Sequence, residues 1–178
     1  MGYEIPAGLG VRLNQPKGEI YVVIGDGTYL MNPTELVTSR QESLKITLVL
    51  LENHGFQCIR NLQMNRVGSS FGNEFRLRDP KTNRLDGKFL EIDFAKNAES
   101  MGARTWKVKT PEELRSALQE ARSEEKTCVI VAETEKYRFS PPSGVWWDVA
   151  AAEVSRNSVT QAARKTYEKG RKLQRFHY

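Results

Sequence analysis

The chain has 178 residues, of which 39% are hydrophobic, so it is long enough for one domain with a sizeable core. No apolar run approaches the roughly 20 residues that cross a membrane, so we expect no membrane partner. The formal net charge of +5 lies entirely within residues 160–178. No nucleic-acid motif or aromatic platform accompanies that basic segment, which argues against nucleic-acid binding.

The beginning of the chain predicts a helix, a strand, a second helix and a second strand. The first helix starts near Pro6, and a turn at residues 14–18 separates it from the apolar run 20–24. A second apolar run, 46–51, follows a helical segment. Both runs are rich in β-branched residues, so this stretch predicts a βαβ unit with two parallel strands.

One oxygen-bearing side chain follows each of these predicted strands. Asp26 lies in the loop Gly25-Asp26-Gly27 after the first strand, and Asn53 follows the second. The carboxyl ends of parallel strands meet at one edge of the sheet, where ligands of such folds bind. We therefore expect Asp26 and Asn53 to lie close together in space.

The chemistry of these residues suits a metal ion and a phosphate group. A carboxylate, an amide oxygen and a loop carbonyl are hard ligands for Mg²⁺, which usually also takes phosphate oxygens. Gly25 and Gly27 allow the backbone to approach a bulky anion, and the following helix points its N–H groups toward the same place. Each half alone is more simply a turn or a loop. Both halves together, each directly after a strand, predict a site for a metal-bridged diphosphate.

The middle of the chain has weaker patterns. Residues 32–35 have the pattern of a capping box with proline at the first helical position. Residues 56–65 are compatible with a helix whose Ile59 and Leu62 face inward. Residues 66–90 are rich in Gly, Asn, Arg and Asp and show weak periodicity. We interpret them as an irregular active-site or interface loop, with plain mobility as the alternative.

The second half continues the alternation of helices and strands. We expect a helix over residues 93–101 capped by Asp93, a strand over 104–108, a helix to Arg122 opened by a capping box at 110–113, and a strand over 127–133. This alternation predicts an α/β fold with an open, mostly parallel sheet and helices on both faces, in a single domain. We place that domain at residues 1–150 and a basic helical tail at 151–178. Trp146 and Trp147 are expected to pack on the body or on a partner chain.

The cysteines indicate the compartment. Cys58 and Cys128 lie far apart without metal-like spacing, and nothing requires a disulfide. The first residues lack the basic and apolar regions of a signal peptide. We therefore expect a cytoplasmic protein.

The motif Gly25-Asp26-Gly27, followed by Asn53 and then Gly55, resembles the cofactor motif of the thiamine diphosphate-dependent enzymes. The resemblance implies that Asp26, Asn53 and the Gly55 carbonyl hold Mg²⁺, which binds the diphosphate. It implies contact of Gly27 and Thr28 with the diphosphate, within this cofactor-binding set: Met1, Gly25, Asp26, Gly27, Thr28, Asn53, Gly55 and Phe56. One departure is Glu52, because the usual motif has an asparagine at that position.

The beginning of the chain extends the resemblance. Met1 matches the bulky apolar residue that props the cofactor into its bent conformation in this family. If Met1 is that prop, it marks the point where a longer chain is cut; a disordered initiator methionine is the alternative. Segments such as residues 2–10, 71–75 and 173–178 resemble the C-terminal cofactor domain of a narrower group. These are the family members that cleave a carbon–carbon bond of a cyclic diketone with water, giving 5-deoxyglucuronate in myo-inositol catabolism.

The resemblance also implies what this chain lacks. In this family the glutamate that activates the cofactor lies on a pyrimidine-binding domain, usually of a neighbouring subunit. We therefore expect no catalytic residue on this chain, a partner pyrimidine-binding domain, a small-molecule substrate and a homo-oligomer. The chain alone is expected to be inactive and to bind thiamine diphosphate weakly. We also expect Asp26 to carry little packing, so that its replacement removes the metal and leaves the fold nearly unchanged.

Other functions have less support or stay open. A dehydrogenase would need Gly-x-Gly-x-x-Gly, and Leu30 stands where the third glycine belongs. Histidine catalysis has only His54 and His177 to draw on. Another thiamine diphosphate enzyme stays open, such as a malonic semialdehyde oxidative decarboxylase or an acetolactate synthase-like carboligase. A non-catalytic domain that only binds or assembles also stays open.

Overall fold

The computed structural model describes residues 1–139 and 149–175. The chain divides into two compact units. The sheet unit contains residues 1–56 and 75–136, and the helical unit contains residues 57–74 and 137–178. The domain boundary that we expect at residue 150 stays a prediction.

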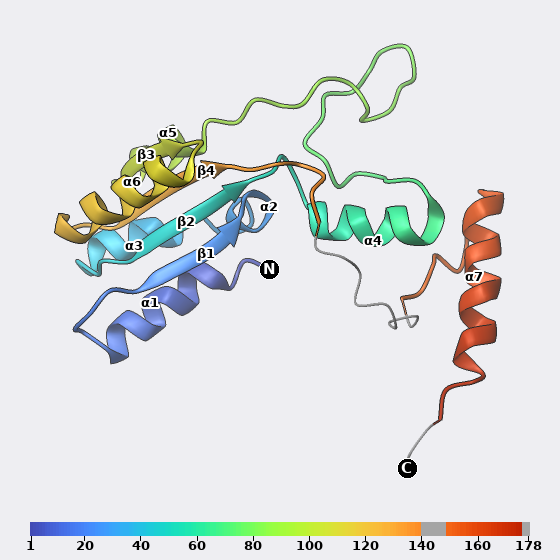
Figure 1. Cartoon of the computed structure of the whole chain (residues 1–178), viewed down its shortest axis with the longest axis horizontal. Helices are drawn as coiled ribbons and strands as arrows, with labels where there is room; N and C mark the ends of the chain where they lie inside the picture. The colour runs from blue at the N-terminus through green and yellow to red at the C-terminus, as the bar shows by residue number, and fades with distance from the viewer. Residues whose placement is uncertain (140–148, 176–178) are drawn as a thin grey trace. The chain divides into compact units, whose positions relative to one another are not determined.

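The sheet unit is built on four parallel strands (Figure 1). In spatial order they are β1 (Tyr21–Gly25), β2 (Thr47–Glu52), β4 (Cys128–Glu133) and β3 (Arg104–Val108). Leu48 and Leu50 of β2 and Ile130 of β4 are fully buried, as expected for inner strands covered on both faces. The predicted α/β fold with a parallel sheet is confirmed. The carboxyl ends of the strands lie at one edge, which we call the carboxyl edge.

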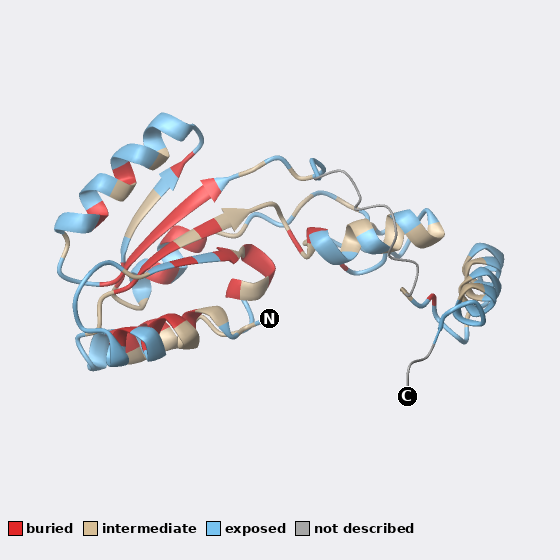
Figure 2. Ribbon diagram, turned by 60° about the horizontal axis from the view of Figure 1, so that its bottom comes forward, coloured by how far each residue is buried: buried red, intermediate tan, exposed pale blue. Residues whose placement is uncertain are grey.

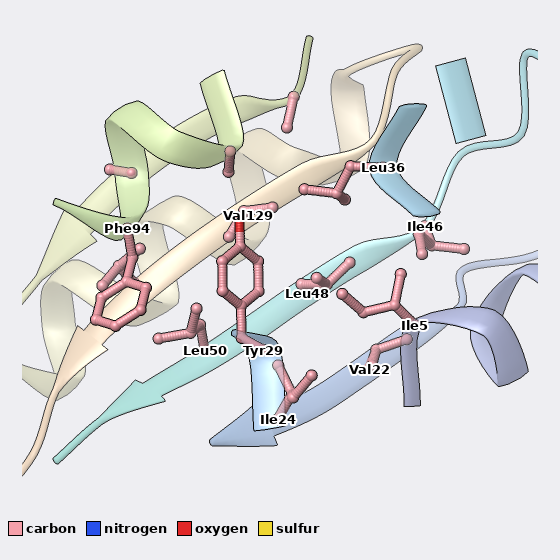
Figure 3. Close-up of a cluster of buried hydrophobic side chains, with 14 of the residues drawn as sticks. Ile5, Val22, Ile24, Tyr29, Leu36, Ile46, Leu48, Leu50, Phe94 and Val129 are labelled. Atoms are coloured by element: carbon pink, nitrogen blue, oxygen red, sulfur yellow. The ribbon is translucent and has the colours of Figure 1, made fainter. Parts of the chain in front are cut away.

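Helices cover both faces of this sheet (Figure 2). One face carries α1 (Glu4–Asn14), α2 (Asp26–Tyr29), α3 (Glu35–Gln41) and α5 (Phe94–Ser100), which share one apolar cluster with the strands. Figure 3 shows the Tyr29 ring of α2 among Leu48, Leu50 and Ile24 in this cluster. On the other face α6 (Pro111–Ser123) packs against β3 and β4. α6 reaches β1 through the Arg122 side chain, which donates to the Tyr21 hydroxyl over 3.3 Å, whereas Val23 of β1 is 63% exposed.

The helix starts test the predicted capping residues. Asp93 caps α5, and Thr110 forms a reciprocal capping box at α6, as predicted. The capping box predicted at residues 32–35, with Asn32 as the cap and Pro33 first in the helix, is wrong. The helix α3 begins only at Glu35, and Asn32 Oδ1 instead accepts from the Thr34 hydroxyl over 3.0 Å. The pattern requires the helix to begin at Pro33, directly after Asn32, whereas Pro33 and Thr34 both precede α3. α1 begins at Glu4, slightly earlier than predicted.

Part of the segment predicted to be irregular is ordered. Residues 75–90 form an antiparallel hairpin, with one bridge between Arg76 and Phe89 and another nearer the tip. Side-chain hydrogen bonds close the tip of this 75–90 hairpin. These residues form no helix or strand, so the expectation of an irregular stretch holds, while its role at an active site or interface stays a prediction. Their sequence lacks the apolar alternation of a half-buried strand, so periodicity gave no signal.

The helical unit contains α4 (Gln57–Val67) and α7 (Ser158–Arg171), which contact each other. Asn157 caps α7, since its side-chain oxygen accepts hydrogen bonds from two amides of the first turn. Both helices lie where a helix was predicted. The inward orientation predicted for Ile59 and Leu62 is wrong, because both side chains are exposed. The described residues of this unit contribute to neither apolar core cluster.

Trp146 and Trp147 lie outside the described residues, so their predicted packing is not tested. Within residues 1–139 and 149–175, no helix is long and apolar enough to cross a membrane.

Candidate functional site

Asp26 lies at the carboxyl edge, where β1 ends. It is the first residue of α2, so Gly-Asp-Gly joins a strand end to a helix start and is not the loop that we predicted. Ile24 before it and Tyr29 after it are both buried in the core (Figure 3). Asp26 itself is 0% exposed. Packing on both sides of the motif therefore holds a carboxylate in a buried position at this edge.

Backbone amides from two segments hold the Asp26 carboxylate. The Gly27 amide donates to Oδ1 over 2.7 Å. The amides of Asn53 and His54 donate to Oδ2 over 3.0 and 2.6 Å. The Gly55 amide lies 3.3 Å from Oδ1 and 3.2 Å from Oδ2. The predicted proximity of Asp26 and Asn53 is confirmed.

Residues 53–55 form a turn whose backbone points three successive N–H groups at one place. His54 has a φ of 62° and Gly55 a φ of 145°. A positive φ is uncommon for residues other than glycine, although histidine is among the enriched exceptions. Successive N–H groups in such conformations form a concave anion site. The anion in this 53–55 turn is the Asp26 carboxylate, so the motif asparagine and glycine are folded around the motif aspartate.

This arrangement corrects the expected role of Asp26. Replacing it would deprive four backbone amides of their acceptor, three of them in another loop. Asp26 is thus a structural residue of the carboxyl edge, and the prediction that it carries little packing is wrong. The sequence gave no sign of this because the partners are 27 to 29 residues away.

Among the described residues, the buried Asp26 carboxyl group has no cationic side-chain partner. Burial raises the pKa of its carboxyl group, and the four amides offset part of that effect. Within the described residues, no Lys, Arg or His side chain forms an ion pair with it. Buried charges in proteins are usually paired or bound to metals. A cation therefore fits here, and Oδ1, with one short and one long hydrogen bond, has the spare accepting capacity.

The donor set suits a metal that accepts neutral oxygens. No group of three or more His, Cys, Asp or Glu side chains in the described part of the chain is placed to hold a metal ion. The side-chain oxygen of Asn53 is buried at the same turn, and Gly55 offers a backbone carbonyl. One carboxylate with two neutral oxygens leaves coordination positions for water and phosphate, as Mg²⁺ sites usually do.

The two motif glycines have different surroundings. A Cβ on Gly27 would lie 2.7 Å from ring carbons of Phe56, so Gly27 is required because this ring packs on its backbone. A Cβ on Gly25 would meet no atom within 4 Å, so the space beside Gly25 is open. Thr28, the next residue of α2, is partly exposed. The contacts of these four residues with a cofactor stay a prediction.

Other charged side chains lie at the carboxyl edge. Glu52 and Glu133 are the last residues of β2 and β4 and lie opposite each other in register. Burial, and secondly the charges of Asp26 and Glu133, raise the pKa of Glu52. Lys109 lies 2.8 Å from Glu133 and lowers its pKa. Glu52, the departure from the usual motif, therefore adds a second half-buried carboxyl group near Asp26.

Sequence reasoning missed the contribution of the 75–90 hairpin. The Phe75 amide donates to the His54 carbonyl over 3.0 Å. The Phe89 ring lies against the His54 ring, with 5.2 Å between centroids. Burial, and secondly the charge of Lys136, lower the pKa of His54, which favours the neutral imidazole. The only sequence signal was the presence of aromatic residues in a stretch without periodicity.

Met1 precedes α1, which begins at Glu4, and is 67% exposed. A Cβ on the neighbouring Gly2 would lie 3.3 Å from Cβ of Met31, just beyond α2. The first residues are therefore close to the helix that Asp26 begins. The role of Met1 as a cofactor prop stays a prediction.

Comparison with known proteins identifies the family. Residues 1–132 match the family described as thiamine pyrophosphate enzyme, C-terminal TPP binding domain, where TPP is thiamine diphosphate. This match includes the four strands up to Ala132 of β4 and every residue of the predicted metal-binding set.

The similarity to curated relatives extends beyond residues 1–132 and covers nearly the whole chain. The chain is 43% identical over 175 residues to 3D-(3,5/4)-trihydroxycyclohexane-1,2-dione hydrolase of Geobacillus thermodenitrificans (strain NG80-2), covering 98% of the chain and 27% of that protein. It is 42% identical over 169 residues to the protein of the same name from Clostridium botulinum (strain Alaska E43 / Type E3), covering 95% of the chain and 26% of that protein. The chain thus spans about a quarter of the length of these relatives.

Solved structures show the same fold. The thiamine diphosphate-dependent 4-hydroxybenzoylformate decarboxylase of Rhodococcus jostii RHA1 superposes with a TM-score of 0.63 at 24% identity, over 76% of this chain and 23% of that one. Benzoylformate decarboxylase from Polynucleobacter necessarius gives a TM-score of 0.65 at 21% identity, over 79% of this chain and 24% of that one. The parallel sheet, the motif folded at its carboxyl edge and the match over residues 1–132 agree. The chain therefore belongs to the thiamine pyrophosphate enzyme family, in which it is a C-terminal TPP-binding domain.

Proposed function

We propose that this chain binds thiamine diphosphate together with Mg²⁺, with Asp26, the Asn53 side chain and the Gly55 carbonyl as metal ligands. The observation that carries the proposal is the fully buried Asp26 carboxylate inside the 53–55 turn. It has no cationic side-chain partner among the described residues, and its neighbours offer neutral oxygens. Mg²⁺ would supply the missing positive charge, and oxygens of the diphosphate would take its remaining coordination positions.

The residues around the metal set would hold the diphosphate. Gly25 has open space beside it, and Gly27 and Thr28 begin the helix that follows. Thiamine diphosphate, when bound, stabilises the carbanion that forms when a carbon–carbon bond next to a carbonyl breaks. The part of this chain is to bind and orient that group through its diphosphate.

We further propose that the chain works within a larger hydrolase that opens a cyclic 1,2-dione by adding water across a carbon–carbon bond, in inositol catabolism. The support is the identity of 42–43% to relatives named as trihydroxycyclohexane-1,2-dione hydrolases. The two decarboxylase structures, at 24% and 21% identity, support the fold alone.

The remaining half of the proposed site belongs to a partner. A pyrimidine-binding domain, of the same longer protein or of a neighbouring subunit in a homo-oligomer, would supply the activating glutamate. Val23 of β1 supports such a contact, because its apolar side chain is 63% exposed. Cys58 and Cys128 are both free thiols, which supports a reducing cytoplasmic location.

Calorimetry of Asp26→Ala tests the metal assignment. In the assembled enzyme, we expect thiamine diphosphate binding to require Mg²⁺ and to disappear in the variant, since the single carboxylate at the ion is removed. Asp86→Ala is the matched control, because Asp86 is an exposed carboxylate of the 75–90 hairpin whose side chain accepts from Thr82. Unaltered Mg²⁺-dependent affinity in Asp26→Ala would contradict the assignment.

A substrate comparison tests the proposed reaction. The assembled enzyme should hydrolyse the cyclic 1,2-dione and leave simple 2-oxo acids unchanged. Turnover of a 2-oxo acid without activity on the dione would place the chain in another thiamine diphosphate enzyme. Absence of both activities, with cofactor bound, would favour a non-catalytic binding domain.

The chain alone should bind thiamine diphosphate weakly, because the pyrimidine pocket is contributed by the partner. Losing about 4 kcal/mol of contacts weakens binding roughly a thousandfold. Fluorescence quenching of the 178-residue chain measures this affinity. Tight Mg²⁺-dependent binding by the chain alone would refute the need for a second domain.

A further inference from the structure

The 53–55 turn is contacted from two sides. On one side its amides donate to the buried Asp26 carboxylate. On the other side lies the base of the 75–90 hairpin, where the Leu90 amide donates to the Phe75 carbonyl over 2.7 Å. The hairpin base is therefore closed by the same residue, Phe75, whose amide donates to His54.

Two aromatic contacts attach the hairpin base to this turn. The Phe89 ring lies against the His54 ring, at 5.2 Å between centroids and 44° between planes. The Phe75 ring meets the edge of the Phe56 ring at 5.8 Å, and Phe56 packs on the backbone of Gly27. The turn and the start of α2 thus share one aromatic support that comes from the hairpin.

The Phe89 ring is itself fixed by charged neighbours. The Arg76 guanidinium lies 3.8 Å from the ring centroid, and the Lys136 ammonium lies 5.1 Å from it. Cations over an aromatic face are attracted by the ring quadrupole. The ring that supports His54 is therefore held by residues from both the hairpin and the segment after β4.

His54 needs such support. Its φ of 62° is uncommon for a residue with a side chain, and such a conformation persists only where the surrounding structure enforces it. Without the Phe89 contact, this conformation would depend on the hydrogen bond from the His54 amide to the Asp26 carboxylate and on the one from the Phe75 amide to the His54 carbonyl.

We propose that Phe89 and Phe75 are positioning residues for the metal-binding turn: by holding His54 and Phe56 they keep Asn53 and Gly55 in the conformation that binds the divalent ion. The metal part of this inference rests on the proposed function above. Neither phenylalanine has a ligand atom for a divalent ion, so each would act through its contact with His54 or Phe56. Outer residues that orient metal ligands typically change metal affinity by about 10–100-fold when they are replaced.

Phe89→Ala is the most informative variant. Phe75 packs against the apolar core, so its replacement would also affect folding, whereas Phe89 belongs to neither core cluster. Phe89→Tyr keeps the ring and serves as the conservative rescue. Phe71→Ala is the matched control, since Phe71 is 86% exposed and lies in the helical unit.

The first measurement is amide hydrogen exchange of the metal-free chain. We expect faster exchange at the amides of residues 53–55 in Phe89→Ala, and unchanged exchange at Leu48 and Leu50 of β2. Phe89→Tyr and Phe71→Ala should match the wild type. Equal loss of protection across β2 would show a general loss of stability and would overturn the positioning role, as would no change at the turn.

The second measurement is the Mg²⁺ concentration that half-saturates cofactor binding in the assembled enzyme. It should rise by about tenfold or more in Phe89→Ala, return to normal in Phe89→Tyr, and be overcome by excess Mg²⁺. An unchanged midpoint would overturn the inference. Cofactor binding by the wild type that does not depend on Mg²⁺ would instead contradict the proposed function, while the exchange result would still decide whether Phe89 holds the turn.

Discussion

Replacing Asp26 by alanine should destabilise the metal-free sheet unit and not only remove a metal ligand. The substitution deletes the acceptor of the Gly27, Asn53, His54 and Gly55 amides in a position that is 0% exposed. A buried donor left without an acceptor costs roughly 1–3 kcal/mol.

The net loss is smaller than the sum over four donors. Water entering the vacated space can satisfy some of the amides, and removing a buried charge, whose burial raises the pKa of Asp26, is favourable in itself. We therefore expect Asp26→Ala to lower the free energy of unfolding by about 2–4 kcal/mol, well above the roughly 1 kcal/mol of an average substitution.

Urea unfolding of the 178-residue chain in EDTA, followed by circular dichroism, measures this loss. With a slope of about 2 kcal/mol per molar urea, the midpoint should fall by about 1–2 M. Asp26→Asn keeps one acceptor oxygen and the side-chain size, so its midpoint should lie between those of the alanine variant and the wild type. A midpoint of Asp26→Ala within about 0.2 M of the wild type would refute the structural role of the carboxylate.

Three further changes test the packing, capping and charge of the sheet unit. Gly27→Ala should lower the free energy of unfolding in urea by about 1–3 kcal/mol, because its methyl group would lie 2.7 Å from ring carbons of Phe56. Gly25→Ala, whose methyl group would have no atom within 4 Å, should lower it by less than about 0.5 kcal/mol. Equal effects of the two variants would contradict the packing argument. Thr110→Ala should cost about 1 kcal/mol in the same assay by removing the capping box of α6, and no loss would show that the box does not contribute. Lys107, 2.8 Å from Asp93, lowers the pKa of Asp93 below its unfolded value of about 3.9, so the stabilisation is present above that pH and is lost as the pH falls through the folded pKa. Asp93→Asn should therefore be less stable than the wild type at neutral pH and equally stable in strong acid, and a difference that persists in acid would contradict this assignment.

Local sequence patterns gave correct predictions where the structure depends on contacts between residues close in the sequence. The β-branched runs became β1 and β2, and Thr110 and Glu113 formed the capping box that their spacing predicted. The similar pattern at residues 32–35 failed because α3 begins at Glu35 and not at Pro33, so Asn32 does not stand at the helix start and its side chain accepts from Thr34 instead. A capping pattern thus needs a backbone conformation that the four residues alone do not specify.

Longer-range placement was predictable only through topology. Two parallel strands bring the residues that follow them to one edge, so the proximity of Asp26 and Asn53 followed from the order of elements alone. That inference places residues at an edge but does not say which atoms meet.

What the sequence determined by itself is therefore the parallel α/β fold and the edge at which the motif lies, because periodicity and strand order depend on residues close in the chain. Only the tertiary structure decided that three amides of the 53–55 turn bind the Asp26 carboxylate, and that Phe56 packs on Gly27. Only the tertiary structure placed Phe89 beside His54. Each of these contacts joins residues 27 to 35 positions apart, and its energy depends on burial and on the exact fit of two segments, which no local pattern of residues records.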